Sequence, residues 1–219
     1  PSLYFTFDEN NSNFTTLKID GCSAMTNLEI SNTNITDFTV VGFESTILTS
    51  FTAENANLND TDVSAILEDL PETVTELYLG SNTGITTVTV PTLRSLSTLH
   101  LNDCTELNTL DVDSCTELEN LDFGESTKLK KINVNGCTGL SELDLSFCTE
   151  LTDLNVAGCS FATLNISNVN VSNLSTLRGL DGTEMVVNGK FFAANTNMTD
   201  SIWQNVLWSL DSMLTQIDW

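Results

Sequence analysis

Pairs of apolar residues two positions apart recur along the chain at intervals of about eleven residues. In the most regular stretch these pairs are Leu99/Leu101, Leu110/Val112, Leu121/Phe123, Ile132/Val134, Leu143/Leu145 and Leu154/Val156. A spacing of two places both members of a pair on the same face of a strand. Each unit therefore predicts a short strand with one buried face.

A small residue that suits a buried position follows three residues after each pair. These residues are Cys104, Cys115, Ser126, Cys137, Cys148 and Cys159. A unit this short cannot enclose a core, so its apolar face has to pack against an equivalent unit stacked beside it. The pattern predicts a solenoid in which two units, or about 22 residues, make one turn.

The spacing of Leu140, Leu143, Leu145 and Cys148, LxxLxLxxC, resembles the leucine-rich repeat. Cys in place of Asn, with a second strand half a turn later, is most similar to the cysteine-ladder internalins and the leucine-rich surface proteins of gut Bacteroidetes. The resemblance covers residues 48–166 best. It implies an α/β solenoid wound as a right-handed superhelix, with short parallel strands on concave and convex sides, a binding surface and no catalytic residues.

One helical repeat is predicted between Leu48 and Asn82. Its helix, near 61–70, begins after Asn59 or Asp60, either of which can cap free amides, and stops at Pro71. The resemblance puts a helix on the convex side of the solenoid. A similar pattern at the end of the chain predicts a second helical repeat, with a helix at about 200–211.

We expect a single domain over residues 1–219, with an N-terminal cap over 1–16, repeats over 17–190 and a C-terminal helical capping repeat over 191–219. Counting along the repeats assigns strands to the two sides. The concave strands are centred on Phe5, Leu28, Phe51, Leu77, Leu99, Leu121, Leu143 and Leu164, and the convex strands on Leu17, Phe38, Val88, Leu110, Ile132 and Leu154.

Two places fit the repeat less well. Ala56 stands where Asn or Cys is expected, so the local turn departs from the pattern. Asn188-Gly189 favours a hairpin turn. Alignment with the earlier helical repeat instead makes it a loop that enters a concave strand.

The six cysteines are expected to remain thiols. Cys104 and Cys148 would lie two turns apart, roughly 9 to 10 Å, which is too far for a disulfide. Cys115 and Cys137 would be within reach, but side chains stacked in a ladder point the same way. Zinc needs thiolates that converge at short loop spacing. We therefore expect buried cysteines that act as small hydrophobic residues, and no metal.

The net charge of −23, from 30 acidic and 7 basic residues, argues against nucleic acid as a partner. No apolar run is long enough to span a membrane, so we expect no membrane insertion of this segment. Much Thr, Ser and Asn with little Lys fits an exported bacterial protein. We expect a monomer that is secreted or at the cell surface, with any lipid anchor outside this sequence.

The candidate ligand site lies on the concave strands. Tyr78, His100, Asp122 and Asp144 are expected to point outward as adjacent steps of one ladder. Phe192 belongs to the same column, and Phe147 is expected at its rim. Exposed aromatic rings beside carboxylates are typical of recognition surfaces. The alternative is a solvated face without a ligand.

The convex columns offer a weaker candidate. Asp111 and Asp113 would stand beside Asn133 and Asn135, and such oxygens suit Ca²⁺. One charge pair in each turn is too diffuse for a binding loop. We expect no cofactor.

A non-enzymatic binding module for a protein or glycan is the leading hypothesis, because the resemblance implies it. A structural spacer is the alternative. A glycan-acting enzyme using Asp122 and Asp144 is more remote, since outward side chains on one ladder lack a water-excluding pocket. The only histidine and the buried cysteines provide no Ser-His-Asp or Cys-His set.

Overall fold

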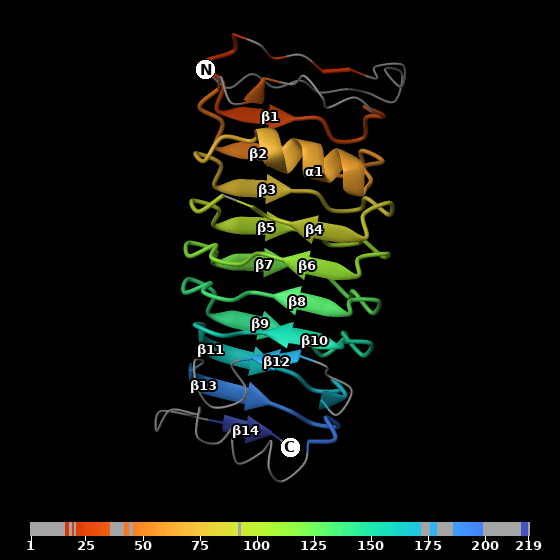
Figure 1. Ribbon diagram of the computed structural model, residues 1–219, viewed down its shortest axis with the longest axis vertical. Helices are drawn as coiled ribbons and strands as arrows, with labels where there is room; N and C mark the ends of the chain where they lie inside the picture. The colour runs from red at the N-terminus through yellow and green to blue at the C-terminus, as the bar shows by residue number, and fades with distance from the viewer. Residues whose placement is uncertain are drawn as a thin grey trace.

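The computed structural model describes residues 16–17, 19, 21–35, 42–43, 46–91, 93–171, 176–178, 186–198 and 216–218. These residues form a parallel β-solenoid whose turns stack in a single column, with β1 and β14 towards opposite ends of the stack (Figure 1). The predicted repeat architecture is therefore confirmed.

One side of the column, which we name the histidine face, carries the strands predicted to be concave. Its strands are β1 (Asn27–Glu29), β2 (Ser50–Thr52), β3 (Glu76–Tyr78), β5 (Thr98–His100), β7 (Asn120–Asp122), β9 (Glu142–Asp144), β11 (Ser160–Asn165), β13 (Val186–Phe192) and β14 (Gln216–Asp218). The middle residues of β1, β2, β3, β5 and β9 are buried in the core, and that of β7, Leu121, is half-buried. Leu77, for example, is aligned with Phe51 on one side and Leu99 on the other.

The opposite side, which we name the helix face, begins with α1 (Asp60–Asp69). It continues with β4 (Thr87–Thr89), β6 (Thr109–Asp111), β8 (Lys131–Asn133), β10 (Asp153–Asn155) and β12 (Thr176–Arg178). These five strands form one continuous sheet. The predicted strand centres from Val88 to Leu154 are confirmed, whereas the strand at Leu177 was not predicted. Leu17 is buried but lies in none of these strands, and the predicted centres Phe5 and Phe38 lie outside the described residues.

Helix α1 begins and ends where the sequence predicts. Asn59 caps its first amides, and Asp62 accepts a hydrogen bond from the Asn59 backbone in return, a capping box. Val63, Ile66 and Leu67 are buried against the strands. Within the described residues α1 is the one helix, so these parts are a β-solenoid rather than an α/β fold. The predicted cap over 1–16 and helix at 200–211 lie almost entirely outside the described residues.

The five cysteines after the strands are buried thiols, and three of them donate a hydrogen bond to the preceding turn. The Sγ atoms of Cys104, Cys137 and Cys159 donate to the carbonyls of residues 79, 112 and 134 at 3.4, 3.2 and 3.0 Å. All six cysteines are free, and only Cys22 is half-buried. Ser126, in the equivalent position, is buried and donates to the carbonyl of Phe123.

Asn82 holds the irregular turn at Ala56. Its amide nitrogen donates to the carbonyls of Ala53 and Leu79 at 2.8 and 2.7 Å. Its side-chain oxygen accepts from the backbone amides of Ala56 and Leu58. The fully buried side chain of Asn82, which comes from the next turn, therefore takes the place of the Asn or Cys expected at position 56.

Strand β13 passes straight through Asn188-Gly189, so neither the hairpin nor the loop forms. It runs parallel to β11, with a register shift opposite Ala162. A Cβ atom on Gly189 would lie 2.2 Å from the carbonyl oxygen of Ala162. Glycine is present here because the two backbones approach so closely.

The histidine face is interrupted between β7 and β9. Its hydrogen-bonded order runs from β1 to β7 and again from β9 to β14, as two sheets. The helix face has no such break at the same level, because β8 pairs with β10. The turns therefore separate on one side only.

Candidate binding face

Tyr78, His100 and Asp122 form a row across three neighbouring strands of the histidine face. The register pairs Tyr78 with His100 and His100 with Asp122, as predicted. The rings of Tyr78 and His100 lie 4.9 Å apart between centroids, tilted at 47°. The Nδ1 atom of His100 is 3.9 Å from a carboxylate oxygen of Asp122. Two aromatic rings and one carboxylate thus form a connected polar surface.

The surroundings of Tyr78 are acidic. Partial burial raises the pKa of its hydroxyl, and the charges of Glu76 and Glu54 raise it further. The hydroxyl therefore stays protonated at neutral pH and remains available as a hydrogen-bond donor. A ligand at this end of the row would meet a donor beside two carboxylates.

The row does not continue to Asp144, which corrects one step of the predicted ladder. Asp122 ends β7 and Asp144 ends β9, and these strands are not hydrogen-bonded neighbours. Both carboxylates also support their own turns. Asp122 accepts from the amide of Gly124 at 2.9 Å, and Asp144 accepts from the amide of Ser146 at 2.8 Å.

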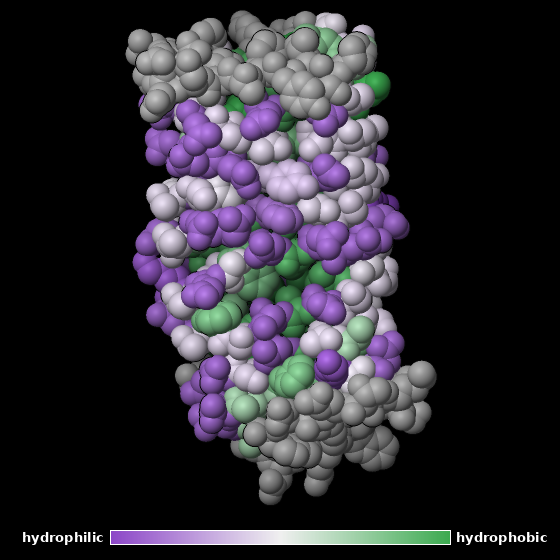
Figure 2. Space-filling view, turned by 180° about the vertical axis from the view of Figure 1, so that it is seen from behind, coloured by the Kyte–Doolittle hydropathy of each residue, from purple (hydrophilic) through white to green (hydrophobic). Residues whose placement is uncertain are grey.

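An open hollow lies at this interruption. Its volume is about 360 Å³, and its lining residues are His100, Glu119, Asn120, Leu121, Asp122, Ser141 and Glu142. Leu121 is only partly buried, whereas its counterparts Leu99 and Leu143 are buried. Figure 2 shows hydrophobic atoms exposed in a hollow about half-way along the stack, with hydrophilic side chains around them. We name this feature the β7–β9 opening.

Phe123 directly follows β7, the strand on one side of the opening. Its buried side chain lies at a position that holds smaller residues in the turns of β1, β2, β3, β5, β9, β11 and β13: Ile30, Ala53, Leu79, Leu101, Leu145, Ile166 and Ala193. An oversized side chain in a close-packed column pushes its neighbours apart. The sequence analysis treated Leu121/Phe123 as an ordinary pair. The signal it missed was the larger ring followed by Gly124.

The remaining predicted residues lie beyond the opening. Phe147 is 47% exposed in the turn after β9. Phe192 is half-buried at the end of β13, where it pairs with Asn165 of β11. The six candidate residues therefore form two groups, Tyr78–His100–Asp122 on one side of the opening and Asp144, Phe147 and Phe192 on the other.

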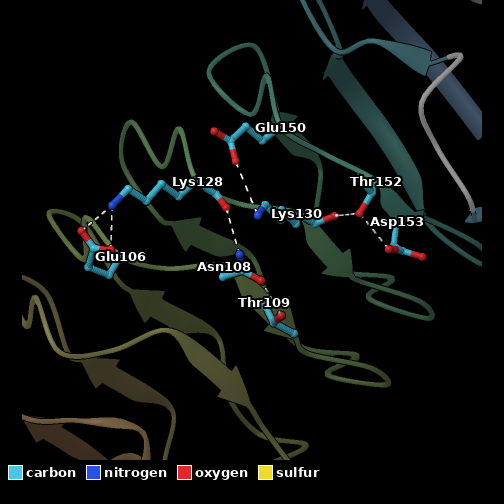
Figure 3. Close-up of polar contacts among 8 residues, drawn as sticks. All are labelled: Glu106, Asn108, Thr109, Lys128, Lys130, Glu150, Thr152 and Asp153. Carbon is cyan, nitrogen blue, oxygen red and sulfur yellow. Dashed lines mark hydrogen bonds and ion pairs between the residues drawn. The ribbon is translucent and has the colours of Figure 1, made fainter.

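Lys128 and Lys130, at the edge of the helix face, form ion pairs with carboxylates of neighbouring turns. The Lys128 ammonium lies 2.6 Å from Glu106, and that of Lys130 lies 3.7 Å from Glu150 (Figure 3). Thr152 donates to the carbonyl of Lys130 and to Asp153. These lysines link successive turns and do not form a free basic patch.

The Asp and Asn side chains of the helix face are hydrogen-bonded to one another between successive turns. Asp111 accepts from the Asn133 amide at 3.0 Å, and Asp113 accepts from Asn135 at 2.6 Å. Among the described residues, no three His, Cys, Asp or Glu side chains are grouped as metal ligands would be. Nor does this part of the chain contain a helix long and apolar enough to cross a membrane.

Comparison with known proteins does not place this chain in a family. No protein-family model matches the chain, and no curated protein matches it.

Proposed function

We propose that this chain is a leucine-rich repeat binding module, secreted or displayed at a bacterial cell surface, whose histidine face recognises a protein or a glycan. The Tyr78–His100–Asp122 row carries the proposal. Aromatic side chains provide contact area at little entropic cost, and the carboxylate selects for polarity. The LxxLxLxxC spacing and the Thr- and Asn-rich composition support the repeat family and the exported location.

The proposed module is not an enzyme. His100 has a carboxylate neighbour, but neither a serine nor a cysteine lies beside it in the described row, and the cysteines after the strands are buried. The face offers contact rather than a closed, water-excluding site.

The test is a variant that removes the aromatic groups on both sides of the opening, Tyr78→Ala/His100→Ala/Phe147→Ala. Wild-type protein on a glycan array and a surface-protein array should select a partner. The triple variant should lose that partner at an unchanged melting temperature. The matched control, Thr89→Ala/Lys131→Ala, removes exposed side chains from the helix face and should bind normally.

Equal binding by both variants would overturn the assignment to the histidine face, and wild-type protein that selects no partner on either array would favour a spacer.

A further inference from the structure

The strands that border the β7–β9 opening each have an unpaired edge. Elsewhere on the histidine face, the amides after β1, β2, β3, β5, β9 and β11 donate to the last carbonyl of the next strand. Leu101 donates to Asp122 at 2.6 Å, and Leu145 donates to Asn165 at 2.7 Å. Residues 93–171 are all described, and within them the equivalent bond from Phe123 to Asp144 is absent. Backbone donors and acceptors on two parallel strands thus border the hollow.

We propose that the β7–β9 opening binds an extended, basic peptide segment, which lies between the two strands and pairs with their free edges. Peptides that add a strand to a sheet gain affinity from main-chain hydrogen bonds and specificity from alternate side chains. This inference rests on the proposed function, because it names the partner class and the place on the same face.

The hollow matches such a segment in size and chemistry. Its volume of about 360 Å³ falls within the range of small ligand sites. The partly exposed Leu121 forms an apolar floor for one side of the peptide. Both strand edges supply hydrogen-bonding groups at the regular spacing of a main chain, which a sugar ring does not reproduce. A peptide therefore fits better than a glycan.

Charge selects a basic segment. Glu119, Asp122 and Glu142 are exposed around the hollow. In the described part of the chain, no lysine or arginine forms an ion pair with any of them. The net charge of −23 adds a long-range attraction for cations. Alternating Lys or Arg side chains would meet these carboxylates while the intervening apolar side chains face Leu121.

The binding test uses an array of synthetic decapeptides in which Lys or Arg alternates with apolar residues. Analogues with Glu in place of Lys, and analogues with alternate amides N-methylated, serve as controls. We expect binding by the basic peptides only. N-methylation should weaken binding about tenfold or more, because it removes several main-chain hydrogen bonds. Binding to the glycan array with none to the peptides would overturn the inference.

Phe123→Leu is the decisive variant, because the smaller side chain should let β7 and β9 pair. Peptide binding should be lost while the melting temperature stays equal or rises. In hydrogen exchange the Phe123 amide should become as protected as that of Leu101. Wild-type Phe123 protection already equal to that of Leu101, or unchanged peptide binding by the variant, would overturn the inference.

Carboxylate variants test the charge argument. Glu119→Gln and Glu142→Gln should each weaken peptide binding about two- to fivefold at low salt, as expected for exposed ion pairs. Glu117→Gln, an exposed carboxylate outside the hollow, should have no effect. Equal effects of all three would contradict the placement. A partner lost in the Tyr78/His100/Phe147 variant but bound normally by Phe123→Leu would refute this inference and leave the proposed function intact.

Discussion

The side-chain oxygen of Asn82 lies 2.9 Å from the backbone nitrogen of Ala56, one turn earlier, and accepts its hydrogen bond. The same buried amide also bonds to Leu58, Ala53 and Leu79. At the equivalent position of the next turn, the thiol of Cys104 donates only one hydrogen bond to the turn before it. Asn82 therefore joins the helical repeat to the regular cysteine-bearing turns.

Replacing this side chain should weaken the whole stack. Asn82→Ala would leave buried amides and carbonyls without partners, and we expect a loss of about 3 kcal/mol in the free energy of unfolding. Urea denaturation measures the change. The control Asn120→Ala removes an exposed amide and should lie within about 0.5 kcal/mol of wild type. Similar losses for both variants would contradict the bridging role.

The buried thiols should make the protein less stable in alkali. Burial raises the pKa of Cys115 to about 11 and that of Cys148 to about 12. Unfolded thiols ionise at about 8.5. Above that pH the unfolded state binds fewer protons than the folded state, so stability falls with rising pH. Stability from Cys148 should be complete below about pH 8.5 and lost progressively towards pH 12.

Urea midpoints between pH 7 and 11 measure how steeply the stability falls with pH. Cys148→Ala should make this fall less steep, even though the variant is less stable at pH 7. An aromatic disulfide reagent at pH 8 gives a second readout. Cys22, the half-buried thiol, should react first, and the buried thiols should react only on unfolding. Rapid labelling of all six in native protein would refute the prediction.

Gly189→Ala should destabilise the turn that contains β13. The added methyl group would clash with the Ala162 carbonyl, so the paired strands would have to move apart. We expect a cost of about 2 kcal/mol, as in other overpacked sites. Asn188→Ala, in the same strand but exposed, should be nearly neutral by thermal unfolding. An equally neutral Gly189→Ala would mean that the backbones are not in close contact.

Much of this architecture follows from local pattern. The period of two within units of about eleven residues predicts the strand centres and their register, because each apolar side chain can be buried only against its counterpart one turn away. The start and end of α1 follow from Asn59 and Pro71. The outward positions of Tyr78, His100 and Asp122 follow from the same register.

The features that the sequence pattern does not predict depend on side-chain volume and on pairing between distant segments. Phe123 fits the strand template, and the break between β7 and β9 beside it is not visible in the local pattern. Asn188-Gly189 has strong turn propensity, yet pairing with β11 keeps it extended. The contact from Asn82 to Ala56 joins positions 26 residues apart, which no local window contains.

The regular register also governs how such a chain can change its length. Paired strands such as β5 and β7 align residues 22 positions apart, Thr98 with Asn120. Gain or loss of one complete turn by gene duplication or deletion would keep every side chain on its own side. Loss of a half-turn would move all later strands to the opposite face, and place the acidic surface where the lysine–glutamate links now lie. Viable length variants of this protein should therefore differ by whole turns.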